Sequence, residues 1–229
     1  MKRVATTIGL VGLLLVAATV NAQQYNATGK IGVGFDGGLM LPSSGDITQD
    51  SSLSDFYKLG PGFGIHATYG IIPGFSVRAG LSYAFMKMED EPAAGRNDDG
   101  DPYFTAPYLY LDGVCNLGGV LGGPQNPFNP YLLAGGGLYF WKASKDGVTG
   151  NAFILTNGEQ FKKTSPGLNF GGGFEYFATP QLSLFAESKY HLVFAKDEDK
   201  FGTDYPDFDN LGLLDISAGL TYHFPVGAK

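Results

Sequence analysis

The chain has 229 residues and a formal net charge of −7 at pH 7, with 16% charged and 14% aromatic residues, 35 glycines and one cysteine. This length suits a single all-β domain, and the charge content is low for a soluble protein, in which about a quarter of the residues are charged. The acidic balance argues against nucleic acid as a partner. The lone Cys115 excludes an intramolecular disulfide.

Residues 1–22 have the features of an export signal. Lys2 and Arg3 precede an apolar run over residues 8–20, and a small-residue cleavage site follows. The apolar run is shorter than the roughly 20 residues that span a bilayer, so a cleaved signal peptide is preferred over a membrane anchor. We therefore expect a mature domain over residues 23–229, and removing the two cations takes its formal charge from −7 to −9.

Eight later stretches alternate large apolar residues with polar or small ones, which is the period of a β-strand. Loops rich in Ser, Asp, Gly and Pro separate some of them, and tight turns separate others. The excursion over residues 142–164 contains Asn157-Gly158, a turn pair that suits a hairpin. In chain order the predicted strands are Lys30–Met40, Phe63–Ile71, Phe75–Met88, Tyr103–Cys115, Tyr131–Trp141, Gly167–Phe177, Leu182–Phe194 and Leu214–Phe224.

The two faces of these strands indicate which side meets lipid. In the strand 214–224 one face is apolar, whereas the other carries an acid, small residues and a histidine. Long and short connections alternate, and a strand of about 11 residues covers about 25 Å of bilayer at the usual tilt. The pattern predicts an all-β fold, an eight-stranded antiparallel up-and-down transmembrane β-barrel with the apolar faces outward. The strand 131–141 has large residues on both faces, so its facing stays open.

The last strand ends Gly219-Leu220-Thr221-Tyr222-His223-Phe224. With its export signal, eight strands and four long loops, the chain resembles bacterial outer-membrane β-barrel proteins of the OmpA transmembrane domain, OmpX and opacity type. The resemblance implies an outer-membrane location, outer-membrane lipid and lipopolysaccharide as surroundings, and extracellular long loops. It also implies that Tyr222 and Phe224 form the signal read by the barrel-assembly machinery. Residues 225–229 extend beyond the usual final aromatic, and the connection 116–129 is longer than a usual periplasmic turn.

Charged and histidine side chains occupy the faces predicted to point inward. Enclosed charges need partners, and eight strands leave an interior that side chains just fill, so we expect a polar network in the lumen. An ion path is the alternative. The histidines lie at different depths, so we expect no metal site among them. The predicted network comprises Lys30, Asp36, His66, Arg78, Asp112, Glu175, Glu187, Lys189, His191, Asp215 and His223.

The loops and the membrane rim carry further charged and aromatic residues. The acidic loops 89–102 and 196–210 are predicted to be solvated tips, or else to bind divalent cations that bridge lipopolysaccharide phosphates. Lysines flank the excursion 142–164, where they contact lipid phosphates or remain solvated; they are Lys142, Lys145, Lys162 and Lys163. We also expect an aromatic girdle of Tyr83, Phe85, Tyr190, Tyr222 and Phe224.

The sequence features predict a function without catalysis. No Gly-x-Ser-x-Gly or similar grouping appears at a strand end, so we expect no enzymatic activity and no cofactor. The expected role is envelope structure or surface interaction through the long extracellular loops. The alternatives are a narrow passive pore or a transporter of small apolar molecules, and an enzyme that modifies envelope lipids. The loop partner and the oligomeric state stay open.

Overall fold

The computed structural model describes residues 28–49, 51–88, 102–120, 127–145 and 147–225. The predicted signal peptide 1–22, nearly all of the acidic loop 89–102 and most of the tail 225–229 lie outside the described residues. The eight barrel strands are β1 (Lys30–Ser44), β4 (Gly60–Ile72), β5 (Phe75–Lys87), β6 (Tyr103–Asn116), β7 (Phe128–Ser144), β8 (Lys162–Phe177), β9 (Leu182–Val193) and β10 (Leu211–Pro225).

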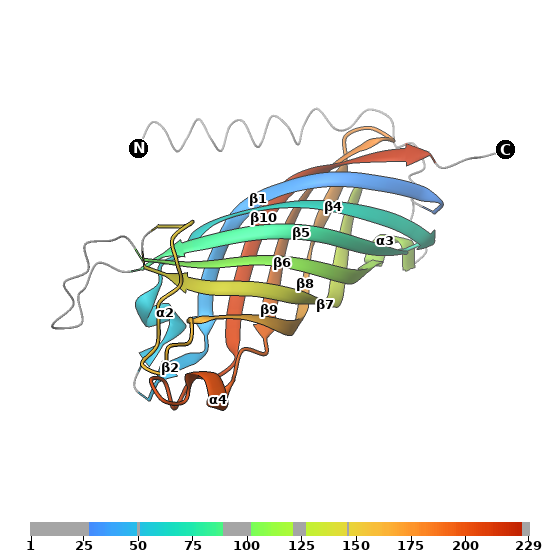
Figure 1. Cartoon of the computed structure of the whole chain (residues 1–229). Helices are drawn as coiled ribbons and strands as arrows, with labels where there is room; N and C mark the ends of the chain where they lie inside the picture. The colour runs from blue at the N-terminus through green and yellow to red at the C-terminus, as the bar shows by residue number, and fades with distance from the viewer. Residues whose placement is uncertain (1–27, 50, 89–101, 121–126, 146, 226–229) are drawn as a thin grey trace, which may run out of the picture.

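These strands close into one barrel in the order β1-β10-β9-β8-β7-β6-β5-β4, and each pairs antiparallel with both neighbours (Figure 1). The predicted eight-stranded antiparallel barrel is confirmed. Small elements lie in the connections: β2 (Asp46–Thr48), β3 (Ser51–Ser52), α2 (Leu53–Phe56), α3 (Leu117–Val120) and α4 (Glu198–Phe201). Within the described part of the chain, no helix is long and apolar enough to cross a membrane.

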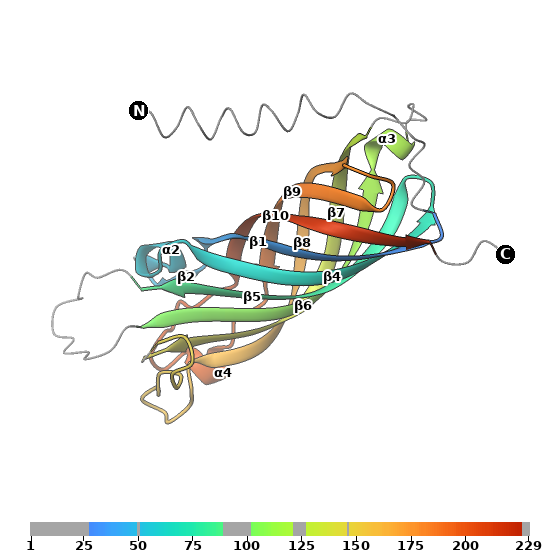
Figure 2. The same cartoon turned by 90° about the horizontal axis from the view of Figure 1, so that it is seen from above.

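The connections divide between the two ends of the barrel. We call the end that carries the connections 45–59, 88–102, 145–161 and 194–210 the long-loop end, and the opposite end the short-turn end. Figures 1 and 2 show α2 and α4 at the long-loop end and α3 at the short-turn end. Several strands are longer than the sequence predicts, since β7 and β8 remain paired out to Lys142 and Lys162, beyond the stretch of regular alternation. The hydrogen-bonded wall therefore extends into the long-loop end.

The apolar faces of the strands point outward. Leu81, in the middle of β5, is 47% exposed, whereas Lys189, in the middle of β9, is only 3% exposed. A surface of this kind is the inverse of a soluble sheet and suits contact with lipid. The facing of β7 is now resolved, because Tyr139 and Trp141 are buried inside the barrel while Leu138 and Phe140 are exposed outside.

Candidate functional site

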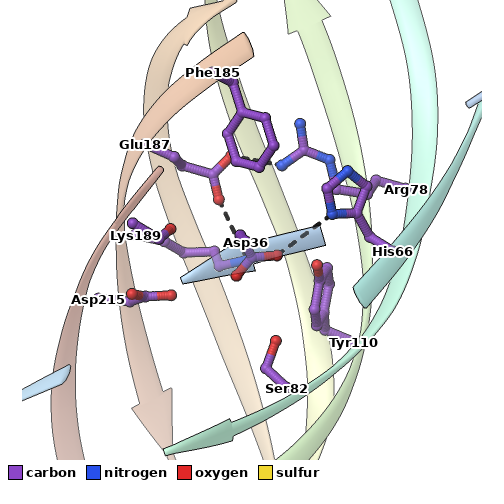
Figure 3. Close-up of a pocket in the computed structure, with 10 residues that line it drawn as sticks. Asp36, His66, Arg78, Ser82, Tyr110, Phe185, Glu187, Lys189 and Asp215 are labelled. Carbon is purple, nitrogen blue, oxygen red and sulfur yellow. Dashed lines mark hydrogen bonds and ion pairs between the residues drawn. The ribbon is translucent and has the colours of Figure 1, made fainter. Parts of the chain in front are cut away.

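Arg78 and Glu187 form the centre of the lumen. They lie on β5 and β9, four positions apart in either direction around the ring of eight strands, and Arg78 Nη1 is 2.5 Å from Glu187 Oε2 (Figure 3). The same carboxylate oxygen accepts a hydrogen bond of 2.8 Å from the Tyr131 hydroxyl on β7. This ion pair therefore spans the full width of the barrel, and both charges are buried.

Lys189 is the second buried cation of the lumen. Its Nζ atom lies 3.4 Å from Asp112 Oδ2 and 3.4 Å from Glu187 Oε1. It also lies 4.0 Å from the centroid of the Tyr110 ring, within the range of a cation–π interaction. Because Asp112 and Tyr110 belong to β6 and Lys189 and Glu187 to β9, one ammonium group joins two strands that are not neighbours in the barrel.

The next polar group surrounds His66 on β4. His66 Nδ1 is 3.5 Å from Asp36 Oδ2 on β1, and Nε2 is 3.1 Å from Thr221 Oγ1 on β10. Asp215 lies on the other side of the cluster and accepts a hydrogen bond of 3.5 Å from the Tyr108 hydroxyl. These contacts tie the strands on both sides of the closure between β1 and β10.

The other two histidines lie away from this group. His191 Nδ1 is 2.7 Å from the Tyr139 hydroxyl. His223 Nε2 is 3.0 Å from Ser183 Oγ, which donates a 2.6 Å hydrogen bond to Glu175 Oε1. Across the described ranges, no three His, Cys, Asp or Glu side chains are arranged to hold a metal ion.

The central side chains leave almost no space between them. No water-sized sphere fits into the gaps between them. Glycines make this packing possible: a Cβ atom at Gly80 would overlap the Tyr110 ring, and one at Gly34 would overlap the His66 ring. The gaps are lined by Asp36, His66, Arg78, Ser82, Tyr110, Phe185, Glu187, Lys189, Asp215 and Ser217 (Figure 3).

The remaining residues singled out in the sequence lie nearer the barrel ends. Lys30 and Glu175 are half-buried on β1 and β8 toward the short-turn end. Tyr222 and Phe224 are exposed on the outer face of β10, with ring centroids 4.8 Å apart. The other girdle residues, Tyr83, Phe85 and Tyr190, face outward and are partly buried.

The sequence analysis missed an aromatic cluster at the long-loop end, which we call the cap. Trp141 of β7 stacks on Phe104 of β6, and Phe161, Phe201 and Phe208 from the connections pack around the indole at centroid distances of 5.6 to 5.7 Å. All five side chains are buried. The sequence signal that could have revealed the cap is the presence of Phe161, Phe201 and Phe208 within loops, because solvated loops do not need large aromatic residues.

Polar contacts hold the same loops together. The Thr156 backbone amide donates a 2.6 Å hydrogen bond to Asp204 Oδ2, and Asn157 Nδ2 donates to the Lys200 carbonyl at 3.0 Å. Asp197 caps α4 by accepting from the Lys200 amide and pairs with Lys163 at 3.3 Å. The acidic stretch at 197–199 is therefore the start of a short helix within the loop, and Glu198 and Asp199 are exposed to solvent.

Comparison with known proteins identifies the family. The family model described as "Outer membrane protein beta-barrel domain" matches residues 10–224. The chain belongs to this family. Membership places the protein in the bacterial outer membrane, in agreement with the outward apolar faces.

Solved structures of this fold are similar to the chain. Neisserial surface protein A is 20% identical, with a TM-score of 0.54, over 87% of this chain and 99% of that one. The outer membrane protein OprG from Pseudomonas aeruginosa is 13% identical, with a TM-score of 0.47, over 87% and 97% of the two chains. The N-terminal β-barrel domain of Pseudomonas aeruginosa OprF is 12% identical, with a TM-score of 0.45, over 87% and 100%. None of the curated proteins matches the chain.

Proposed function

We propose that this protein is a closed outer-membrane barrel that conducts no ions and presents an ordered surface at its long-loop end to a partner outside the cell. In this role the barrel holds the protein in the membrane, and the loops form the surface that contacts the partner. The protein would contribute to surface interaction and envelope structure, without catalysis.

The observation that carries the proposal is the contact between Arg78 and Glu187 across the lumen. A pore for ions needs a continuous path for water, and the gaps around this pair are too narrow for one water molecule. Breaking such a pair to open the path would leave buried charges without partners, which is strongly unfavourable. The described lumen is therefore better suited to holding the wall together than to passing solutes.

The cap supports the second half of the proposal. Flexible loops that only fill space need no buried aromatic core, whereas here Phe161 and Phe201 are buried and their ring centroids are 5.3 Å apart. An ordered loop surface loses less conformational entropy when it binds a partner. The hairpin over 152–161 and the segment 197–208 therefore form a preformed surface beyond the membrane.

Loop replacement tests this function. A short Gly-Ser link in place of residues 149–159 removes the hairpin tip, and heat-modifiable migration on a gel then reports whether the barrel still folds. We expect the variant to fold and to lose adhesion or phage adsorption when it is displayed on cells.

A matched control replaces the turn 178–181 at the short-turn end. That variant is expected to keep full adhesion, because this turn lies at the opposite end of the barrel. If replacement of each described long connection left adhesion and adsorption unchanged, the loop surface would have no such role. A changed lipid mass profile in cells carrying the protein would favour an enzyme instead.

A further inference from the structure

A second cavity opens on the outer wall of the barrel. It has a volume of about 680 Å³ and lies at the long-loop end, between the outward faces of β6, β7 and β8 and the connection 145–161. Its residues belong neither to the lumen network nor, apart from Trp141, to the cap. The cavity is therefore a separate site at the edge of the membrane-facing surface.

Four lysines line this cavity: Lys142, Lys162, Lys163 and Lys200. No acidic side chain is among its described lining residues, although the whole chain has a formal charge of −7. Lys142 and Lys162 are directly opposite each other on β7 and β8. Like charges in that position destabilise a sheet. A bound anion would compensate for the positive charge of these lysines.

The charges of these lysines are only partly neutralised by the protein. Lys163 pairs with Asp197 at 3.3 Å, and Lys200 lies 3.8 Å from Glu159. Among the residues that the structure describes, the Lys142 ammonium donates to the Gly150 carbonyl alone, at 2.8 Å. Within the described chain, neither Lys142 nor Lys162 has a carboxylate within 4.0 Å. Two cations of the cavity are thus available to an anion.

Thr105 on β6 provides an independent indication of a ligand. Its side chain lines the cavity and is 1% exposed, and its Oγ1 atom has no hydrogen-bond partner among the described residues. A buried hydroxyl without a partner is unfavourable and uncommon. A ligand oxygen in the cavity would accept this hydrogen bond.

The floor of the cavity is apolar and continues into the lipid-facing wall. Pro107 and Phe140 line it, and the pairing between β6 and β7 skips the level of Ala106 and Pro107. Proline has no backbone N–H to donate there. Lys142 lies two residues beyond Phe140 on the same outward face, about 7 Å toward the long-loop end. The cations therefore lie just above an apolar surface, as the headgroup of a lipid lies above its acyl chains.

We propose that this cavity binds a lipid whose headgroup carries an exposed phosphate monoester, with the phosphate between Lys142, Lys162 and Thr105. The acyl chains then lie along the apolar wall below Phe140. The inference does not depend on the lumen being closed, so its failure would leave the proposed function untouched.

Trp141 provides the readout, because it is the only tryptophan of the chain and lines the cavity. The folded full-length mature barrel in neutral detergent is titrated with dioleoyl phosphatidic acid, dioleoyl phosphatidylcholine or inorganic phosphate while Trp141 emission is recorded. We expect a saturable change with phosphatidic acid, and a far weaker response to the choline lipid and to inorganic phosphate.

Two variants test the named contacts. Lys142→Gln/Lys162→Gln should weaken phosphatidic acid binding about 25-fold, since each lysine near an anionic lipid contributes about a fivefold factor. Thr105→Val should weaken binding several-fold without lowering the stability of the lipid-free barrel, because it removes a hydroxyl that has no partner. A purely structural role for Thr105 would leave binding unchanged.

The control is Lys58→Gln/Lys196→Gln, which removes the same charge outside the cavity and should bind as the unaltered protein does. Equal weakening in this control would show general attraction to an acidic micelle and overturn the site. Unchanged binding by both cavity variants would overturn it as well. Equal binding of inorganic phosphate, or of phosphatidylcholine, would contradict the assignment to a lipid phosphate monoester.

Discussion

Arg78 and Glu187 project from opposite points of the ring of strands, and their charged groups meet at 2.5 Å in the middle of the lumen. The pair closes the lumen between β5 and β9, whereas an open pore would leave a water-filled gap between these strands. Its neighbours Lys189 and Tyr131 contact the same carboxylate. The pair thus links barrel stability to the absence of a water path.

The first prediction concerns the stability of this pair. Arg78→Met should lower the free energy of unfolding by about 3–5 kcal/mol, because it leaves the Glu187 carboxylate buried with one cation fewer. Arg78→Met/Glu187→Met should be more stable than the single variant, since no uncompensated carboxylate remains. Urea unfolding in phospholipid vesicles, followed by Trp141 emission, measures both. A loss below about 1 kcal/mol for the single variant, as for an exposed ion pair, would show that the contact is solvated.

A second prediction uses two adjacent glycines of β1. A Cβ atom at Gly38 would overlap the Ile216 carbonyl oxygen, which belongs to the backbone and cannot move aside, whereas one at Gly37 would lie 3.7 Å from Phe63 in ordinary contact. Gly38→Ala should therefore impair folding, and Gly37→Ala should be tolerated. Heat-modifiable gel migration compares the folded fractions. The reverse order would mean that the faces of β1 are assigned the wrong way round.

The third prediction concerns the cap. Phe201→Ala removes a buried ring that contacts Trp141 and Phe161, and substitutions of this kind cost about 3–5 kcal/mol in a packed core. We expect the loss to appear as faster hydrogen exchange and protease cleavage in 152–161 and 197–208, while the barrel strands stay protected. Protection of these loops equal to that of the unaltered protein would show that the cap does not order them.

A fourth prediction tests contact with lipid. Leu81 lies at the middle of β5 and is exposed outward, so Leu81→Lys should cost about 2–4 kcal/mol in vesicles. The same change at Phe85, four residues nearer the long-loop end, should cost less because the penalty falls toward the interface. Equal small costs at both positions would indicate that water reaches the middle of the wall.

The sequence was sufficient to predict the barrel because its signal is periodic and local. Alternation placed Glu187 and Lys189 on one face and Leu184 on the other, and burial in the structure follows this division. The sequence did not show which charges meet, because Arg78 and Glu187 are 109 residues apart and come together only through the tilt and stagger of the closed sheet. The facing of β7 could not be predicted since Tyr139 and Phe140 are both large and apolar.

The loops were harder to predict for a different physical reason. Phe161, Phe201 and Phe208 follow no strand or helix period, so no pattern showed that they pack on Trp141. The partner of Asp197 was equally hidden, because its pairing with Lys163 joins the connection 194–210 to the start of β8, which is distant in the sequence. Contacts of this kind depend on the closed barrel, which brings the loops and strand ends together.

Single-channel recording in planar bilayers tests the closed lumen most directly. The unaltered barrel should give no steady conductance step, because the side chains around Arg78 and Glu187 leave no gap for a water molecule. A reproducible step from the unaltered protein, changing in size when Arg78 or Glu187 is neutralised, would contradict the account.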